Sequence, residues 1–176
     1  MPKTLVITAD THLPKRARDL PPELWSVIET ADVLIHAGDW VDVALLEELE
    51  TRRGGELVGV HGNNDTGPLR DRLPEVATTT IGGVSFAVVH ETGPASGRER
   101  RMDAAFPGVD VLVFGHSHIP WDTVTPGGLR LLNPGSPTDR RRQPVETFMT
   151  ATVAEGQLRD VRLVTVQPGW RRPSRR

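Results

Sequence analysis

Five short runs of apolar, mostly β-branched residues set the strongest limit on how this chain can fold. They read TLVITA (4–9), VLIHA (33–37), ELVGV (56–60), VSFAVV (84–89) and VDVLVF (109–114). Most of them are apolar at successive positions, so both faces of each extended strand need cover from water. Such strands are typical of α/β proteins, in which other layers cover each face of a sheet.

Two helices are predicted between the first three runs. Residues 21–30, PPELWSVIET, combine prolines suited to a first helical turn with helical spacing of apolar residues. Residues 41–55, VDVALLEELETRRGG, form a clearer pattern, in which three leucines share one face before Gly54 ends the helix. The leucines are Leu45, Leu46 and Leu49.

Two hairpins are predicted in the remaining chain. Residues 75–89 carry a Gly-Gly pair between two strand patterns, and residues 144–166 carry AEG between two more. We therefore expect an α/β fold whose sheet is parallel in its first part and antiparallel later. A chain of 176 residues suits one domain, which we place at residues 1–168, with residues 169–176 as a flexible basic tail.

Composition excludes several classes of function. The formal net charge of -2 gives no cationic field for nucleic acid, and the lack of cysteine excludes disulfides and thiolate metal sites. The N-terminus has no signal-peptide pattern, and no apolar run approaches the ~20 residues that span a membrane. We expect a cytoplasmic protein that binds neither membrane nor nucleic acid.

Polar side chains follow each of the five apolar runs, at the point where the predicted strand ends. They are Asp10 and His12, Gly38-Asp39, His61 to Asp65, His90, and Gly115 to His118. Ligands of open α/β sheets collect beyond the carboxyl ends of the strands, so we expect these side chains to gather at one rim. The clusters hold five of the 6 histidines in the chain, which makes chance a poor explanation.

The residue types in these clusters indicate a metal centre. Imidazole nitrogens, carboxylate oxygens and an amide oxygen suit manganese, iron, zinc or nickel. The pairs Asp10/His12 and His116/His118 are two residues apart, so in extended backbone both members of a pair face the same way. The candidates outnumber the ligands of one tetrahedral site, which indicates two ions. Two divalent ions about 3.5–4 Å apart need an anionic bridge, and Asp39, preceded by glycine, could lie close to both.

The ordered motifs D-x-H, G-D, G-N-x-D, H and G-H-S-H resemble those of the calcineurin-like metallophosphoesterase superfamily. In this chain they are Asp10 and His12, Asp39, Asn63 and Asp65, His90, and His116 and His118. The short chain and the turn Asn133–Ser136 resemble the small single-domain, YfcE-type phosphodiesterase branch, and the likeness runs from about Thr4 to Ser136. Each motif alone is weak, whereas the ordered set is specific.

The resemblance implies a fold and a ligand set. The fold would be a four-layer α/β/β/α sandwich, with two mixed sheets packed together and helices outside. One ion would be held by Asp10, His12, Asp39 and His118, and a second by Asp39, Asn63, His90 and His116, with Asp39 as the bridge. Manganese is the first expectation for both ions, with nickel, zinc, iron or magnesium as alternatives.

The segment His61 to Asp65, here called the asparagine loop, and the neighbouring candidate Glu91 determine the expected chemistry. Asn63 is a neutral oxygen ligand that leaves net positive charge for phosphate, although an Asx turn is the alternative reading. Many superfamily members carry histidine where this chain has Asn64, and an amide cannot transfer a proton to a leaving group. We place Asp39, Asn63, Asn64 and Asp65 in the catalytic set, with Asp65 as an acceptor that fixes the loop. Glu91 replaces a usual glycine, either as a plain surface residue or as a carboxylate that weakens anion binding, and it makes His90 the least secure ligand.

Other conspicuous residues have ordinary interpretations. We interpret them as packing, support or solvated charge, and they are His36, His61, Trp40, Trp121 and the arginine runs 98–101 and 140–142.

The expected function is a phosphodiesterase that attacks a small phosphoester, such as a nucleotide-like one, with a metal-activated water. A scaffold without catalysis, like the retromer subunit built on this fold, is one alternative, and a phosphomonoesterase or nuclease is another. The missing imidazole disfavours the monoesterase, and the acidic balance gives the nuclease no support. The sequence leaves homo-oligomer formation open.

Overall fold

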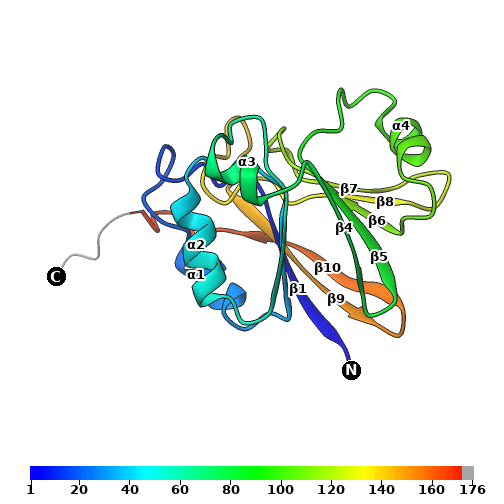
Figure 1. Ribbon diagram of the computed structural model, residues 1–176, viewed down its shortest axis with the longest axis horizontal. Helices are drawn as coiled ribbons and strands as arrows, with labels where there is room; N and C mark the ends of the chain where they lie inside the picture. The colour runs from blue at the N-terminus through cyan, green and yellow to red at the C-terminus, as the bar shows by residue number, and fades with distance from the viewer. Residues whose placement is uncertain (172–176) are drawn as a thin grey trace.

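Two five-stranded sheets packed face to face form the centre of the protein, which the computed structural model describes over residues 1–171 (Figure 1). The first sheet has the order β10 (Gln157–Thr165), β9 (Thr147–Ala154), β1 (Lys3–Thr8), β2 (Val33–His36) and β3 (Glu56–Gly59). The second has the order β4 (Val76–Ile81), β5 (Val84–Val89), β6 (Val111–Val113), β8 (Arg130–Asn133) and β7 (Trp121–Val124). All five apolar runs form strands, and β4–β5 and β9–β10 are the two predicted hairpins.

The directions of the strands differ in part from the expectation. Strands β1, β2 and β3 are parallel, and the antiparallel strands β9 and β10 extend the same sheet. The second sheet is mixed, because β5, β6 and β8 are parallel to one another. The prediction of an antiparallel later part is therefore wrong for these three strands. Helix α4 (Arg98–Ala105), whose charged sequence gave no helical apolar pattern, carries the chain back between β5 and β6. Strand β7, antiparallel to β8, carries it back between β6 and β8.

The space between the sheets is filled by aliphatic and aromatic side chains. The first sheet contributes residues such as Ile7 and Ile35, and the second contributes Phe86, Val113 and Leu132, all at most 1% exposed. Each of these strands also buries its opposite face, which explains why the five runs are apolar at successive positions.

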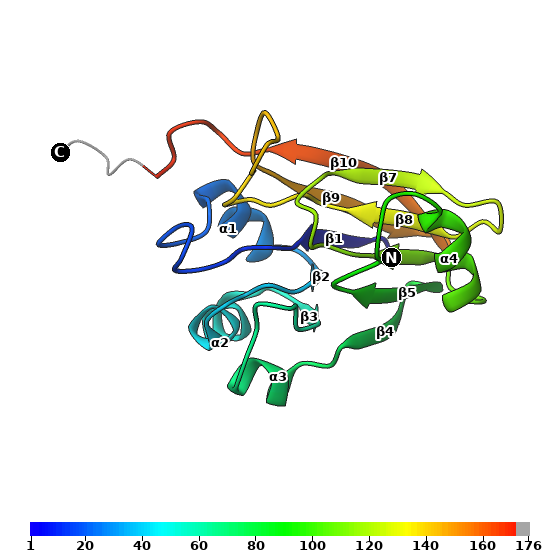
Figure 2. The same cartoon turned by 90° about the horizontal axis from the view of Figure 1, so that it is seen from above.

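Helices cover the two outer faces of the sandwich. Helices α1 (Pro22–Ile28), α2 (Val43–Arg52) and α3 (Pro68–Arg72) pack on the first sheet, and α4 packs on the second. Figure 2 shows α1 and α2 on one side of the molecule and α4 on the other. The four-layer α/β/β/α sandwich is therefore confirmed.

Helix α2 has the predicted buried face, formed by Leu45, Leu46 and Leu49. Asp42 begins it by accepting a hydrogen bond from Ala44 N at 2.9 Å. The glycines after it serve close packing rather than a left-handed turn, since a Cβ on Gly54 or Gly55 would collide with backbone carbonyl oxygens of residues 29 and 32.

The end of the described chain contacts the domain. Of the predicted tail, residues 172–176 lie outside the described residues. Trp170 Nε1 donates to Glu146 Oε2 at 2.9 Å, and the Arg171 guanidinium lies 2.6 Å from Glu146 Oε1. Within residues 1–171, no helix combines the length and apolar character needed to cross a bilayer.

Candidate metal centre

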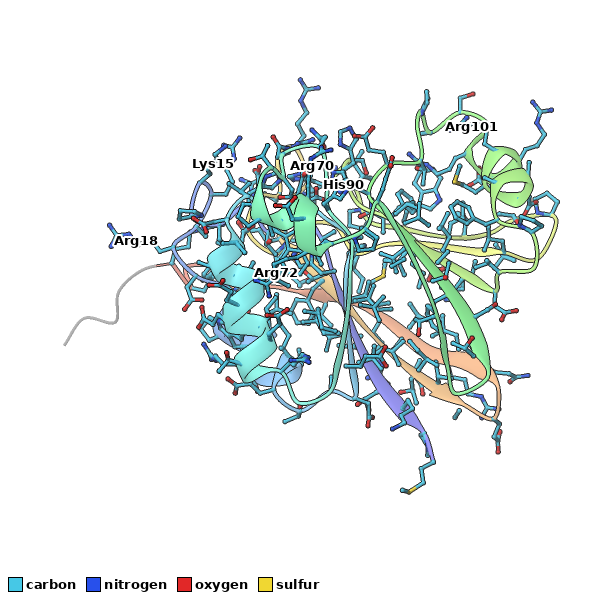
Figure 3. All side chains as sticks on the ribbon, in the orientation of Figure 1. Lys15, Arg18, Arg70, Arg72, His90 and Arg101 are labelled. Atoms are coloured by element: carbon cyan, nitrogen blue, oxygen red, sulfur yellow. The ribbon has the colours of Figure 1, made fainter. Side chains whose placement is uncertain are left out.

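Polar residues that follow strands of both sheets meet at one rim of the sandwich. Backbone hydrogen bonds join the loops there, from Asp10 N to Gly38 O at 2.9 Å and from Gly115 N to His90 O at 3.0 Å. Figure 3 shows His90 at this rim beside Arg70, and both side chains line one cavity of about 350 Å³. The predicted gathering of these loops is therefore present.

One group of donor atoms comes from the loops after β1, β2 and β6. The Nε2 atoms of His12 and His118 lie 3.2 Å apart. Asp10 Oδ1 lies 3.8 Å from His12 Nε2 and 3.5 Å from His118 Nε2. Asp39 Oδ2 lies 3.6 Å from His12 Nε2. All four residues are buried, so their polar atoms face one another rather than water.

A second group lies next to the first and shares Asp39. Asn63 Oδ1 lies 3.0 Å from both His90 Nε2 and His116 Nδ1. Asp39 Oδ2 lies 3.4 Å from His90 Nε2. One carboxylate oxygen of Asp39 thus borders both groups, which is the position that a bridging ligand requires.

These spacings fit divalent ions. Donor atoms that bind one ion at about 2.1 Å lie roughly 3.0–3.4 Å apart in octahedral or tetrahedral geometry. The shorter distances in both groups fall in that range, and the remainder are a few tenths of an ångström longer. Each group could therefore hold one ion after small movements of side chains.

The electrostatics of the centre also fit cations. Burial alone would lower the pKa of His90, but its hydrogen bond to Asp39 and the charges of Asp10 and Asp39 outweigh burial and raise this pKa to about 9. Burial opposes ionisation of Asp39, yet His90 and Asn64 hold its pKa well below the usual range. The carboxylates therefore stabilise positive charge at this point. Burial lowers the pKa of His12, which favours the neutral imidazole that a metal needs.

Left-handed backbone occurs at five residues of the centre. Such φ values are rare outside glycine and cluster at functional sites. They occur at Asp10 (55°), His12 (45°), Asp39 (61°), His116 (69°) and His118 (59°). The prediction that extended backbone aligns each D-x-H or H-x-H pair is therefore wrong, because sharp left-handed turns aim these side chains.

Two glycines allow the loops to approach each other. Gly38 has a φ of 89°, and a Cβ there would lie 2.7 Å from His90 Nδ1 and 2.9 Å from Gly62 N. A Cβ on Gly62 would collide with the Asp39 carboxylate and lie 2.5 Å from Asp39 N. The glycine before Asp39 and the glycine before Asn63 are therefore steric requirements of the centre.

Further hydrogen bonds orient the candidate ligands. His90 donates from Nδ1 to Ala37 O at 2.7 Å, and His118 donates from Nδ1 to Asp139 O at 2.5 Å, so both Nε2 atoms face the centre. The Asn133–Ser136 turn also reaches the centre, since Ser136 Oγ donates to Asp10 O at 2.7 Å. The placement of this turn near the centre, suggested by the resemblance alone, is confirmed.

Asp65 lies behind the centre and does not face the donor atoms. Its buried carboxylate accepts backbone N–H groups from Asp39 at 2.9 Å, Val41 at 2.7 Å and Gly62 at 2.7 Å. Burial raises the pKa of this carboxyl, and the three N–H groups oppose that shift. Asp65 therefore joins the Asp39 loop to the asparagine loop, as the sequence predicts.

Asn64 contacts the shared carboxylate. Its backbone N–H donates to Asp39 Oδ1 at 2.9 Å, and its side-chain Nδ2 donates to Asp39 Oδ2 at 2.6 Å. Both Asn63 and Asn64 are exposed, so the asparagine loop forms the open side of the centre.

Most of the residues given ordinary interpretations pack or support. His36 is completely buried, stacks on Trp40 with ring centroids 3.5 Å apart, and lies with Nε2 3.0 Å from Thr11 Oγ1. Burial lowers the pKa of His36 to about 3, so it remains neutral. Trp121 packs in the second sheet's outer core, and His61 is partly exposed in the cavity beside the centre.

Three supporting residues have no clear signal in the sequence. Arg70 Nε donates to Asp65 O at 2.6 Å and so holds the asparagine loop from α3. Asp139 lies within a segment that looks like an ordinary polar turn. Arg98, interpreted as solvated charge, is instead 5% exposed, with its guanidinium between the rings of Phe114 and Trp121. These roles depend on contacts between distant segments, which local sequence patterns do not encode.

Comparisons with known proteins agree with this geometry. Residues 4–156 match the calcineurin-like phosphoesterase superfamily domain. A probable metallophosphoesterase of Methanocaldococcus jannaschii is 35% identical over 151 residues, which are 85% of this chain and 75% of that protein. A solution structure of a Thermotoga maritima protein has a TM-score of 0.73 at 30% identity, covering 93% of this chain and 99% of the other.

A more distant neighbour shares the fold. Vps29 of Entamoeba histolytica, solved as a complex with zinc, has a TM-score of 0.68 at 21% identity, covering 93% of this chain and 99% of that one. The family match includes every candidate ligand and strands of both sheets, and it ends before β10. The chain therefore belongs to the calcineurin-like phosphoesterase superfamily.

Proposed function

We propose that this protein is a phosphodiesterase that uses two divalent metal ions. The observation that carries the proposal is the position of Asp39 Oδ2, which lies 3.6 Å from His12 Nε2 in one donor group and 3.4 Å from His90 Nε2 in the other. A single carboxylate shared by two groups of donor atoms is the arrangement that a pair of divalent ions needs.

The first ion would be held by Asp10, His12, Asp39 and His118. The second would be held by Asp39, Asn63, His90 and His116. Manganese is our first choice for both, because the shell mixes imidazole nitrogen with carboxylate and amide oxygen, and nickel, zinc, iron or magnesium are alternatives. When bound, such ions lower the pKa of a water held between them and stabilise charge on phosphoryl oxygens.

The residues of the chain favour an anionic substrate. Only Asp10 and Asp39 contribute negative charge to the two groups, so two divalent ions would leave the centre positive. Asn63 and Asn64 are exposed on its open side, where they can donate amide N–H bonds to phosphoryl oxygens. Asp65 and Arg70 keep this loop in place through backbone contacts.

Asn64 supports a diester with an acidic leaving group over a monoester. An amide orients an oxygen but cannot protonate it, and general acid catalysis typically contributes about 10²–10⁴-fold. A small nucleotide-like diester in the cytoplasm fits this chemistry, and homo-oligomer formation is open to measurement by size exclusion.

The test is to strip the purified protein with a chelator and reload it separately with manganese, nickel, zinc or magnesium. We expect hydrolysis of bis(p-nitrophenyl) phosphate to exceed that of p-nitrophenyl phosphate. Asp39→Asn should abolish activity and paired metal binding, whereas Asp42→Asn, the same change at an exposed helix cap, should leave both intact.

Two results would point to a different function. A preference for the monoester would indicate a phosphomonoesterase. Hydrolysis of neither ester by fully loaded protein would favour a scaffold on the same fold. The likeness to Vps29, at 21% identity, shows the fold alone and does not by itself favour that alternative.

A further inference from the structure

Glu91 carries a carboxylate on the open side of the second donor group. Its Oε1 lies 3.7 Å from His116 Nδ1, and the two side chains are 52% and 47% exposed. One donor atom each from His90, Glu91 and His116 lies within 4.8 Å of the other two. These three residues are therefore close enough to share one ion after small movements of side chains.

The surrounding contacts leave this carboxylate free to turn toward an ion. His90 is fixed by its hydrogen bond to Ala37 O at 2.7 Å, which aims Nε2 at Asn63 Oδ1. His116 Nδ1 faces the same amide oxygen at 3.0 Å. Within residues 1–171, no lysine or arginine forms an ion pair with Glu91, so no cation there holds its carboxylate elsewhere.

We propose that Glu91 is an additional oxygen ligand of the second metal ion, an inference that rests on the proposed function. Asp39, Asn63, His90 and His116 would supply one charged donor and three neutral ones. Glu91 would add a second charge at a position otherwise open to water or substrate phosphate. The carboxylate would therefore make the chain bind the second ion more tightly and bind anions more weakly.

The chemistry of the added donor predicts which ions benefit. Affinity for hard ions such as manganese and magnesium rises with the number of charged oxygen ligands. The same carboxylate lies beside the approach to the centre, where its charge repels phosphate. Glu91 would thus raise the occupancy of the second metal position and lower the affinity of the centre for anions.

The test uses full-length Glu91→Gln with Glu75→Gln as its matched control. Glu75 is exposed in the same cavity of about 350 Å³ but is not part of the donor cluster, so its variant removes equal charge without removing a donor. Manganese is titrated into metal-free protein by calorimetry, with free manganese counted by electron paramagnetic resonance. Inorganic phosphate is then titrated into the manganese-saturated proteins, and circular dichroism compares their folding.

The expected result is selective. Wild type binds two manganese ions, and Glu91→Gln loses about tenfold or more in affinity at one of them, the scale on which lost metal contacts weaken binding. Phosphate affinity rises severalfold in Glu91→Gln. Glu75→Gln stays within about twofold of wild type in both titrations.

The outcomes separate this inference from the proposed function. If wild type binds no manganese pair, the proposed dinuclear centre fails. If wild type binds two ions and Glu91→Gln binds them equally well, the Glu91 ligand is refuted while the centre stands. Equal weakening by Glu91→Gln and Glu75→Gln would also refute it, because general electrostatics would then account for the loss.

Discussion

Among single residues, Asn64 most affects the chemistry expected of the centre. Its side chain donates to Asp39 Oδ2 at 2.6 Å and lies on the exposed side. It can position a phosphoryl or leaving oxygen near the shared carboxylate, but it has no proton to transfer at neutral pH. Substrates whose leaving groups need no protonation should therefore react best.

Asn64→His should raise kcat/KM for diesters with basic alkoxide leaving groups, by up to about 10²-fold, the lower end of general acid effects. Turnover of p-nitrophenyl diesters should change little, because that leaving group needs little protonation. The measurement is a series of diesters of graded leaving-group pKa with the manganese-loaded enzyme. Asn64→Ala, which removes the amide and adds no acid, is the control. Equal gains across the series would contradict the role assigned to Asn64.

Asp65 acts at the same scale through backbone contacts. Asp65→Asn replaces one carboxylate oxygen by an N–H donor that would face backbone N–H groups of Asp39, Val41 or Gly62. A buried donor left without an acceptor costs about 1–3 kcal/mol, so the free energy of unfolding of metal-free protein should fall by that amount in urea. Manganese affinity should fall too, since Asp39 loses its support. Asp71→Asn, an exposed position on α3, should change neither quantity.

The residue types of the centre could be predicted from the sequence, whereas their geometry could not. Strand ends followed by Asp, His and Asn predicted where the donors gather. Spacing by two residues wrongly suggested extended backbone, because only tertiary contacts force Asp10 and His12 into left-handed conformations. The interpretation of Arg98 as solvated charge is wrong for a similar reason, because its burial depends on the rings of Phe114 and Trp121, which lie elsewhere in the chain.

At the scale of secondary-structure elements, the turns after the strands determine where the donor atoms of the centre lie. Residues with left-handed backbone occupy the loops after β1, β2 and β6, and Gly38 lies in the loop after β2, directly before Asp39. Helices α3 and α4 and strands β7 and β8 are not predicted from the sequence, since short or charged segments carry little periodic signal. The core strands were predictable because burial on both faces leaves an uninterrupted apolar run.

Gly38→Ala tests whether one loop must approach another this closely. The new Cβ would lie 2.7 Å from His90 Nδ1, so Asp39 and His90 must separate and manganese affinity should fall at least about tenfold. Gly67→Ala is a matched control, because Gly67 also has a left-handed φ of 52° but a Cβ there meets nothing within 4 Å. Both variants should lose stability from backbone strain, by more than about 1 kcal/mol. If both variants lose manganese binding, or if neither does, the close approach of Gly38 to His90 is not what manganese binding requires.

At the scale of the whole molecule, the centre connects the two sheets. Asp10, His12, Asp39 and Asn63 follow strands of the first sheet, and His90, His116 and His118 follow strands of the second. Elsewhere the sheets meet through an apolar core that includes Phe86. A bound ion would therefore add a further link between two layers that the apolar core and hydrogen bonds at the rim, such as His90 Nδ1 to Ala37 O, already join.

Metal binding should consequently stabilise the fold as a unit. Manganese at 100 times its dissociation constant should add about 2.7 kcal/mol per site to the free energy of unfolding, and a chelator should remove that increment. Asp10→Asn should lose most of the increment. Phe86→Ala should lower overall stability by about 3–5 kcal/mol through its cavity and still retain the increment, because the rim is untouched. Hydrogen exchange provides the decisive comparison: manganese should slow exchange in both β2 and β6, and slowing confined to one sheet would mean that the ions do not join the two layers.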